Sequence, residues 1–500
     1  MIKILDTLQQ KAVDLCTMQT ESISSIELME LAAKGCCSFF PKPIRKQNLV
    51  VFCGVGNNGG DGLAIARMQQ NNFSSLKVKI IQTSEIYSES FKVNLERWKA
   101  VGGKVEIIKD KSEINLSEND IVVDAIFGTG LTRKVGTLIS ECIKEINRQA
   151  KYIISIDLPS GLFASKLSEG EIIKADLTLT IGSPKIALLV PENSQYVGEW
   201  KLVSIYTNQI CFEGLNIVHN LFDLSSAKRI LKNRSKFTHK GSFGKALLVV
   251  GSETKYGAAI LASRAAMRSG VGLLRVHLPV NGKQLIHLSI PEAIVETDSN
   301  NEFITSIGDL EIYDAIGVGP GIGTANETID GFIALIKEYP LPTVIDADGL
   351  NILSEHPDLF TNLSENSILT PHLKEFERLF GSSENSFERL EKQIKHSVLH
   401  KIIIVCKGHY TIITLPDGRV FFNNSGNSGL AKAGSGDVLT GIITSLLAQG
   451  YLPEEAALLG VFVHGYSADL LLATKHEMGM LPSDVIENLP ETFKKISEQN

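Results

Sequence analysis

The stretch Leu49-Val-Val-Phe-Cys-Gly54 decides the fold of the first half of the chain, because it is a continuous apolar run that ends in glycine. Such a run is typical of a strand that is buried on both faces of a parallel sheet. A turn rich in Gly and Asn follows, and we expect a helix from about Gly62. Further strands and intervening helices are expected at 78–81, 121–125 and 153–156, and at 91–100 and 138–150. The alternation predicts a doubly wound, Rossmann-like α/β sheet.

A second α/β domain is expected in the other half of the chain. The strand and helix rhythm weakens between Tyr206 and Arg234 and restarts at Lys245-Ala-Leu-Leu-Val-Val-Gly251, which indicates a boundary near residue 215. A chain of 500 residues also exceeds the size at which one hydrophobic core keeps growing. Later strands are predicted at 273–278, 315–318, 343–346, 402–406 and 411–415.

The composition limits the classes of partner. The formal net charge of -7 gives no basic field for a polyanion, so we expect no nucleic-acid partner. No run of about 18 uncharged apolar residues occurs, so neither export nor membrane insertion is expected. The seven cysteines show neither metal-site spacing nor a disulfide framework, which favours a reducing cytoplasm.

Polar side chains gather at three predicted strand ends of the first half. Gly54-Val-Gly-Asn-Asn-Gly-Gly-Asp-Gly62 follows one strand, Asp124 ends another, and Asp157 and Ser160 follow a third. Ligands of open α/β sheets bind at that edge, although a tight structural turn would also be rich in Gly and Asn. The glycine spacing fits neither a P-loop nor the dinucleotide fingerprint. Asn58, Asp124 and Ser160 offer hard oxygens that suit an alkali or alkaline-earth cation.

These motifs, with Asp124-Ala-Ile-Phe-Gly-Thr-Gly-Leu131 and Asp157-Leu-Pro-Ser-Gly-Leu162, resemble the NAD(P)H-hydrate epimerase family over residues 1–213. The resemblance implies that Asp157 is the proton-shuttling carboxylate and that Asn58, Asp124 and Ser160 hold potassium. It further implies that the damaged cofactor, NADHX or NADPHX, is bound by Asn57, Asn58, Gly59, Gly60, Asp61, Gly128, Thr129, Gly130, Leu131, Thr132, Arg133, Lys134 and Asp157.

The second half contains a carboxylate directly after a glycine-rich turn, in Lys432-Ala-Gly-Ser-Gly-Asp-Val-Leu-Thr-Gly441. Backbone N–H groups at the opening of the predicted helix would favour a phosphate, and Asp437 would lie beside the reacting group as base. Taken alone, the motif is equally typical of a capped helix entry. It accompanies His239-Lys-Gly-Ser-Phe-Gly-Lys245, Gly319-Pro-Gly-Ile-Gly323, Asp346-Ala-Asp-Gly-Leu-Asn351 and Thr370-Pro-His-Leu-Lys-Glu-Phe376.

That set resembles the NAD(P)H-hydrate dehydratase family, which has a ribokinase-like fold, over residues 222–497. The resemblance implies that Asp437 acts on the hydrate hydroxyl while a nucleotide phosphorylates it, with Mg²⁺ at the phosphates. The implied hydrate-binding residues are Gly319, Gly321, Pro371, His372, Leu373, Lys374, Glu375, Phe376, Glu377 and Asp437. The implied nucleotide-binding residues are Lys407, Gly408, His409, Tyr410, Thr411, Asn427, Ser428, Gly429, Leu430, Ala431, Lys432, Ala433, Gly434, Ser435 and Gly436.

Together the two resemblances imply a bifunctional repair enzyme that epimerises R and S hydrates and dehydrates the S form. Fusion of the two domains favours ADP, which would give AMP and phosphate, over ATP. The alternative is a ribokinase-like kinase of vitamin precursors that is fused to a non-enzymatic cofactor-binding module. We also expect a homo-oligomer, although no residue pattern defines its size.

Overall fold

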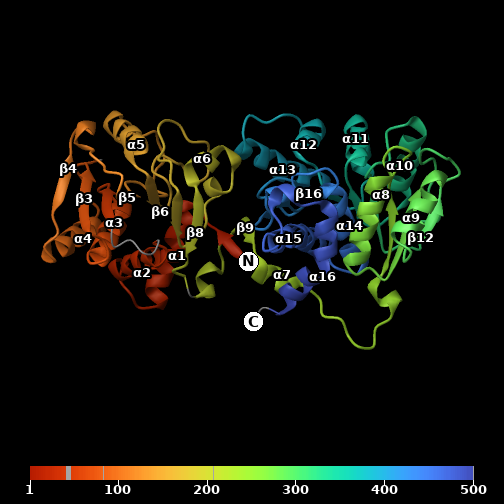
Figure 1. Cartoon of the computed structure of the whole chain (residues 1–500), viewed down its shortest axis with the longest axis horizontal. Coiled ribbons are helices and arrows are strands. Elements are labelled where there is room, and N and C mark those ends of the chain that lie inside the picture. Colours follow the sequence, from red (N-terminus) through yellow and green to blue (C-terminus); the bar gives the residue numbers. More distant parts are fainter. Residues whose placement is uncertain (41–46, 83, 207, 499–500) are drawn as a thin grey trace. The chain divides into compact units, whose positions relative to one another are not determined.

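The computed structural model describes residues 1–40, 47–82, 84–206 and 208–498. The chain divides into two compact units, which we call the N-terminal unit (mainly Ile2–Ile217) and the C-terminal unit (mainly from Val218 onward). Both are α/β (Figure 1). No helix in the described ranges is both long enough and apolar enough to cross a membrane.

The N-terminal unit has a parallel sheet in the order β4-β3-β2-β5-β6-β7-β8, which is a doubly wound arrangement. Its strands are β1 (Ile2–Ile4), β2 (Asn48–Cys53), β3 (Ser75–Ile81), β4 (Val105–Ile108), β5 (Asp120–Ala125), β6 (Tyr152–Ile156), β7 (Leu177–Ile181) and β8 (Glu199–Val203). Its helices are α1 (Thr7–Thr20), α2 (Ser25–Ser38), α3 (Asn57–Gln69), α4 (Glu89–Ala100), α5 (Thr137–Gln149) and α6 (Ser194–Val197).

The strand and helix predictions for this unit are confirmed except at the start of α3. The predicted turn after β2 is already helical, because α3 begins at Asn57 rather than near Gly62. Gly59 explains the early start: a Cβ there would lie 1.8 Å from the carbonyl oxygen of Gly54. Glycine therefore lets the first turn of α3 pack directly on the end of β2.

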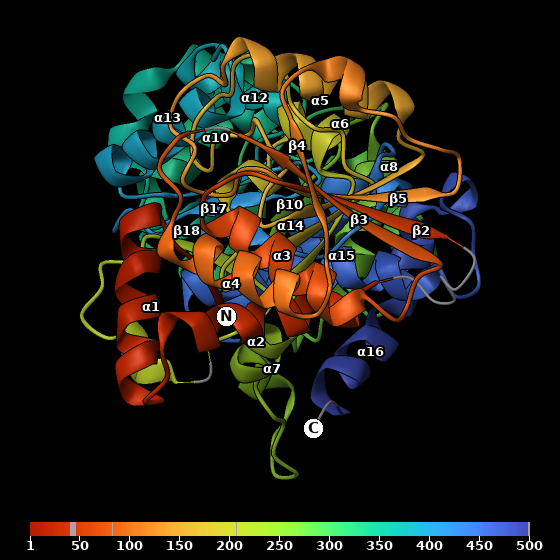
Figure 2. The same ribbon diagram turned by 90° about the vertical axis from the view of Figure 1, so that its left-hand side faces the viewer.

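Alternate residues of β2 face opposite layers of the N-terminal unit. Leu49, Val51 and Cys53 belong to a core formed with α2, α3 and α4, whereas Val50 and Phe52 pack in a second core with α5. Figure 2 shows α3 and α4 side by side, with α5 beyond the strands. Both faces of the strand are buried, which explains why the sequence reads as one apolar run.

The C-terminal unit has a larger sheet in the order β9-β18-β17-β16-β15-β14-β13-β10-β11-β12, in which β17 is antiparallel to both neighbours. Its strands are β9 (His219–Phe222), β10 (Lys245–Val249), β11 (Leu273–Leu278), β12 (Ile294–Thr297), β13 (Ala315–Val318), β14 (Thr343–Ile345), β15 (Ile368–Leu369), β16 (Ile403–Cys406), β17 (Ile412–Thr414) and β18 (Val420–Asn423). Its helices are α7 (Leu224–Ile230), α8 (Tyr256–Arg268), α9 (Lys283–Ser289), α10 (Asn326–Glu338), α11 (Asp348–Glu355), α12 (Leu373–Phe380), α13 (Ser386–His400), α14 (Ser435–Ala448), α15 (Pro453–Leu471) and α16 (Pro482–Glu498).

Two buried cores flank this sheet as well. Ala246 and Leu248 of β10 pack with α8, α14, α15 and α16, whereas Leu247 and Val249 pack with α10, α11 and α12. The five strands predicted here are all present, with ends within one residue of the predicted ones. Predicted motifs of the second half lie at the carboxyl ends of β14 and β16 and at the start of α14, which are close together in the fold.

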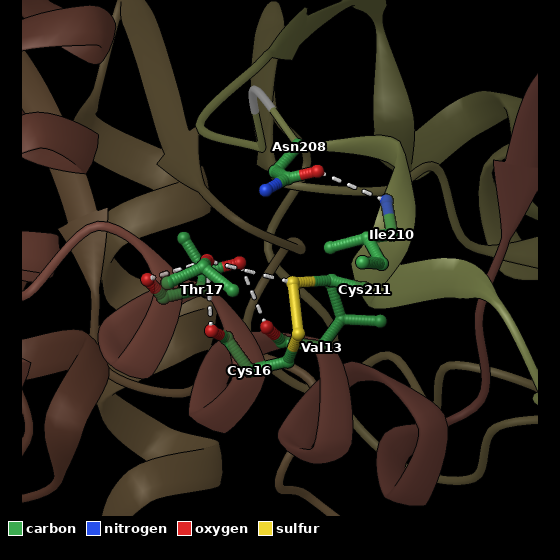
Figure 3. The surroundings of a disulfide bond; sticks show 7 residues. Val13, Cys16, Thr17, Asn208, Ile210 and Cys211 are labelled. Atoms are coloured by element: carbon green, nitrogen blue, oxygen red, sulfur yellow. Dashed lines mark hydrogen bonds between the residues drawn. A yellow bond between two sulfur atoms is a disulfide. The ribbon is translucent and has the colours of Figure 1, made fainter.

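The expectation of a chain without disulfides is wrong. Cys16 of α1 and Cys211 of a short 3₁₀ helix (Gln209–Phe212) form a disulfide across a separation of 195 residues (Figure 3). Such a separation leaves no local spacing signal in the sequence. The other five cysteines are free, and four of them are buried.

Candidate active sites in the two units

A cavity of about 930 Å³ opens at the carboxyl edge of the N-terminal sheet. Its wall is formed by the start of α3, the loop after β5, the end of β6 and residues of α1 and α2. The predicted residues that line it are Asn57, Asn58, Asp61, Gly128, Thr129, Gly130, Leu131, Thr132 and Asp157. This is the edge where open α/β sheets bind ligands.

Asp157, directly after β6, is the central carboxylate of the cavity. Its φ of 68° lies in the left-handed region, which is uncommon for residues other than glycine and which aspartate tolerates better than most. The buried ammonium of Lys185 donates to Oδ1, and the backbone N–H of Thr129 donates to Oδ2 over 3.0 Å. Burial raises the pKa of Asp157, but the Lys185 charge and these hydrogen bonds more than offset it and hold the pKa below its ordinary value. Asp157 is therefore an ionised carboxylate.

Asp124, Ser160 and Asn58 form a buried oxygen cluster next to Asp157. Ser160 donates to Asp124 through both its backbone N–H and its hydroxyl, and Ser155 adds a third bond of 2.8 Å. Asn58 donates from its amide nitrogen to the carbonyl oxygen of Ile156, and its buried Oδ1 has no hydrogen-bond partner among the described residues. A buried acceptor without a donor is costly unless a cation or water satisfies it. The cluster thus fits a hard monovalent cation.

Four of the predicted binding residues lie outside the cavity wall. Gly59 and Gly60 are buried in the first turn of α3, where a Cβ would meet Gly54 and Met29 respectively. Arg133 and Lys134 are exposed. They are consistent with contacts to the outer part of a large ligand, whereas the two glycines shape the backbone.

Two features of this site were not predicted. Lys185 lies after β7, a strand that was not predicted even though Leu177-Thr-Leu-Thr-Ile181 alternates apolar residues with threonine and is followed by Gly182. Asp14, on α1, also lines the cavity, and the hydroxyl of Tyr206 donates to its Oδ1 over 2.7 Å. A single aspartate in a helix carries no sequence signal for a site.

In the C-terminal unit, Asp437 lies in the first turn of α14, which begins after Gly434 at a φ of 92°. The turn packs against a buried charged pair, because a Cβ on Gly436 would lie 3.3 Å from both Asp346 Oδ2 and Lys407 Nζ. Lys407 donates to Asp346 Oδ1 over 2.8 Å, and Thr440 donates to Oδ2 over 2.9 Å. Burial and the nearby Asp346 charge raise the pKa of Asp437 to about 7. A carboxylate with that pKa suits a general base near neutral pH.

The segment that follows β15 joins the same charged group. His372 caps α12 by accepting the N–H of Glu375, whose side chain accepts the N–H of His372 in return. Glu375 also lies 3.8 Å from Lys407 Nζ. Pro371 accepts the backbone N–H of Lys407, whereas Phe376 is buried in the core. His372 therefore has a structural role as a cap.

Glycines let other backbone segments approach the charged residues Asp346, Lys407 and Asp437. Gly319 and Gly321 have positive φ, and a Cβ on Gly319 would lie 1.9 Å from the carbonyl oxygen of Asp346. The loop before α14 is fixed by Asp469, which accepts from Gly426 N–H and from the Asn427 amide. At the helix start, Ser435 Oγ lies 3.2 Å from the Nε2 of buried His464. Neither Asp469 nor His464 was predicted.

The comparisons with known proteins match both units. A family model described as NAD(P)H-hydrate dehydratase matches residues 246–491, and one described as YjeF-related protein N-terminus matches residues 25–187. The bifunctional NAD(P)H-hydrate repair enzyme Nnr of Moorella thermoacetica is 33% identical over 95% of this chain and 94% of its own length. The protein of the same name from Escherichia coli is 30% identical over 92% of this chain and 87% of its own length.

A solved ribokinase-like superfamily protein from Enterococcus faecalis covers 57% of this chain and 100% of its own, with 27% identity and a TM-score of 0.51. An ADP/ATP-dependent NAD(P)H-hydrate dehydratase from Bacillus subtilis, co-crystallised with ATP and Mg²⁺, covers 55% of this chain and 98% of its own, with 29% identity and a TM-score of 0.49. The two bifunctional repair enzymes extend over both units and favour the repair-enzyme interpretation over the vitamin-precursor kinase. The chain belongs to the family of bifunctional NAD(P)H-hydrate repair enzymes.

Proposed function

We propose that the N-terminal unit, residues 1–213, interconverts the R and S epimers of NADHX and NADPHX, and that the C-terminal unit, residues 222–497, dehydrates the S epimer. The observation that carries this proposal is the placement of one aspartate in each unit: Asp157 in the wall of a 930 Å³ cavity, and Asp437 at the start of α14. The epimerase residues bind the whole cofactor, for which the cavity volume is suitable.

In the epimerisation, Asp157 moves the proton of the hydrate hydroxyl. The hydroxyl-bearing carbon of the hydrate is bonded to the ring nitrogen, so deprotonating the hydroxyl opens the ring to an aldehyde that can close on either face. Asp157 is ionised by Lys185 before the substrate arrives and can accept this proton. Thr129 N–H keeps the carboxylate oriented toward the cavity loop.

Potassium belongs to this proposal as a bound cofactor of the N-terminal unit. Asn58, Asp124 and Ser160 would hold it, and the unpartnered Oδ1 of Asn58 supports the assignment. A bound cation would supply positive charge at the carboxyl edge of the sheet. Because Asn58 is in the first turn of α3, the cation would lie beside the start of that helix.

In the dehydration, Asp437 accepts the hydroxyl proton of the S hydrate as the hydroxyl is phosphorylated, and loss of phosphate together with a proton from the adjacent ring carbon then restores the dihydronicotinamide ring. The N–H groups of Gly434, Ser435 and Gly436 at the start of α14 would stabilise the transferring charge. Residues Lys407 to Thr411 and Asn427 to Gly436 would bind the nucleotide. The first group follows β16 and the second precedes α14.

The nucleotide in this proposal is ADP, which would leave AMP and phosphate, and Mg²⁺ would neutralise its phosphates. Mg²⁺ sites of this kind use phosphate oxygens with one or two carboxylates. In the described ranges no cluster of three or more His, Cys, Asp or Glu side chains forms a metal site, which agrees with a metal held mainly by the nucleotide. A homo-oligomer and a cytoplasmic location complete the proposal; five free cysteines agree with a reducing compartment, whereas the Cys16–Cys211 disulfide is unusual there.

The test follows recovery of the reduced-nicotinamide absorbance from an R and S mixture of NADHX with the full-length protein, Mg²⁺, K⁺ and either ADP or ATP. Full recovery with ADP supports both activities and the nucleotide choice. Recovery that stops at the S fraction contradicts the epimerase assignment. A stable phosphorylated product from a vitamin precursor, without recovery of absorbance, would contradict the dehydratase assignment.

A further inference from the structure

A second carboxyl group shares the epimerase cavity with Asp157. Asp14 lies on α1, in the cavity wall, and is half-buried. Among the described residues, the hydrogen bond from the Tyr206 hydroxyl holds this carboxyl, and it engages only Oδ1. Asp14 is thus oriented by a partner from a distant part of the sequence, as the acids and bases of enzymes commonly are.

The two carboxyl groups have opposite electrostatic environments. The charged and titratable groups around Asp14 are Tyr206, Lys185, Asp157, Asp61 and, on its own helix, Lys11. Burial raises the pKa of Asp14 and the charge of Asp157 adds to the rise, whereas the Tyr206 hydrogen bond and Lys185 act in the other direction. Asp157, in contact with Lys185, has a lowered pKa. Two carboxyl groups whose pKa values are pushed apart form a natural acid and base pair.

The chemistry of the hydrate can use such a pair. Opening the ring removes a proton from the hydroxyl oxygen and delivers one to the ring nitrogen, and these are different atoms. Asp157, held by Lys185 and by the N–H of Thr129, can take the first proton. A single carboxylate would have to carry that proton from oxygen to nitrogen, whereas a second carboxyl group that is already protonated can supply the nitrogen directly.

We propose that Asp14 is this group: a protonated carboxyl that donates to the ring nitrogen of the hydrate and takes the proton back on ring closure. This inference rests on the proposed epimerase function and adds a second catalytic residue to it. Asp157 accepts the hydroxyl proton, the carbon–nitrogen bond breaks with its electron pair on nitrogen, and Asp14 protonates that nitrogen. Rotation of the aldehyde and the reverse steps on its other face give the opposite epimer and restore both carboxyl groups.

Asp61 is the competing candidate, because it also lines the cavity and burial raises its pKa. Asp61 lies in α3 just after its first turn, within the Gly/Asn segment that binds the cofactor in our proposal. Asp14 differs from it in having a hydroxyl partner that fixes the carboxyl. Asp61→Asn is therefore the matched comparison for Asp14→Asn, because both remove a cavity carboxyl with a raised pKa.

The experiment measures initial rates of loss of purified R-NADHX across pH with the full-length protein and no nucleotide, so that dehydration is silent. We expect Asp14→Asn to lower kcat by about 10²-fold with little change in KM, and to remove the fall of kcat at alkaline pH. Asp14→Glu should restore part of the rate. Tyr206→Phe should move the alkaline fall to higher pH, because the Tyr206 hydrogen bond lowers the pKa of Asp14.

Calorimetry of each variant reports whether the N-terminal unit remains folded, because dehydration of S-NADHX depends on the C-terminal unit alone. An Asp14→Asn variant that keeps the alkaline fall of the parent protein would overturn the inference, as would loss of that fall in Asp61→Asn instead. An unmoved profile in Tyr206→Phe also contradicts it. If the unaltered protein does not exceed the spontaneous rate of epimerisation, the proposed function itself fails, which is a separate outcome.

Discussion

The two sites each contain a lysine that contacts an aspartate, but the aspartate has a different place in each. In the N-terminal unit the buried Lys185 contacts Asp157 directly, and the pKa of that aspartate is lowered. In the C-terminal unit the partly buried Lys407 contacts Asp346, and the neighbouring Asp437 has its pKa raised to about 7. The same residue types therefore produce a carboxylate with a lowered pKa in one unit and a carboxylate that titrates near neutral pH in the other.

The difference matches the chemistry that we propose for each unit. Epimerisation needs a base that is ready in its ionised form over a wide pH range. Phosphoryl transfer from a hydroxyl needs a base that both takes the proton and releases it again at neutral pH. The position of the lysine ammonium group decides between these behaviours. It lies beside the reacting Asp157 in one unit and beside Asp346, the neighbour of Asp437, in the other.

The largest expected effect is the loss of one activity in each aspartate variant. Asp157→Ala should reduce epimerisation by about 10³-fold or more and leave dehydration of S-NADHX unchanged, and Asp437→Ala should do the converse. Separate assays of purified R and S hydrates measure the two activities. A variant that loses both activities while remaining folded would contradict the division of labour.

Lys185→Met tests whether the contact between Lys185 and Asp157 lowers the pKa of Asp157. Without the ammonium group, burial dominates and the pKa of Asp157 rises, so epimerisation should fall by roughly 10²-fold near pH 7 and recover as the pH is raised. Leaving a buried carboxylate without its partner should also lower the stability of the N-terminal unit by about 3–5 kcal/mol. A pH profile of the parent shape would show that Lys185 does not control Asp157.

Asp346→Asn tests whether Asp346 and Lys407 set the pKa of Asp437 in the C-terminal unit. Removing the Asp346 charge takes away an influence that raises the pKa of Asp437, and it frees Lys407, whose charge lowers that pKa. The rise of dehydratase activity with pH should therefore move to lower pH, with a loss of rate at its plateau of about tenfold. The pH profile is measured with S-NADHX and saturating ADP. If its midpoint is unchanged in the variant, Asp346 does not influence the pKa of Asp437.

The smallest effect on activity is expected from the disulfide, which belongs to the N-terminal unit alone. Cys16→Ser with Cys211→Ser should lower the free energy of unfolding of that unit by about 2–4 kcal/mol, because the unfolded chain gains freedom. The matched control is Cys37→Ser, at a free and only partly buried cysteine in the same unit. Calorimetry should show a shift in one transition and none in that of the C-terminal unit.

The sequence predicted the central strands that are buried on both faces, missed others such as β7, and revealed little of the electrostatics of the sites. Runs such as Leu49–Cys53 are buried on both faces, so their composition alone reveals them. The start of α3 was misplaced because Gly59 and Gly60 have low helix propensity, and close packing on Gly54 overrides that propensity. The motifs also led to Asn57, Asn58 and Asp157 in the cavity wall.

What remained hidden depends on residues that are distant in sequence. The pKa of Asp437 follows from Asp346 and Lys407, on other elements of the sheet. Likewise, the sequence does not reveal that Asp14 of α1 lies in the cavity wall and accepts a hydrogen bond from Tyr206. The Cys16–Cys211 disulfide joins the same two segments. A sequence pattern shows which side chains end a strand, but not which charges meet in the folded chain.

The most direct test is to measure both activities of the full-length protein across pH, with R-NADHX in the absence of nucleotide and with S-NADHX at saturating ADP. We predict that dehydration rises with pH through a midpoint of about 7, as Asp437 ionises. Epimerisation should show no such rise at neutral pH, because Asp157 is already ionised there. If both activities rise through the same midpoint, or if dehydration is already at its plateau at pH 5, the opposite pKa shifts of Asp157 and Asp437 are contradicted.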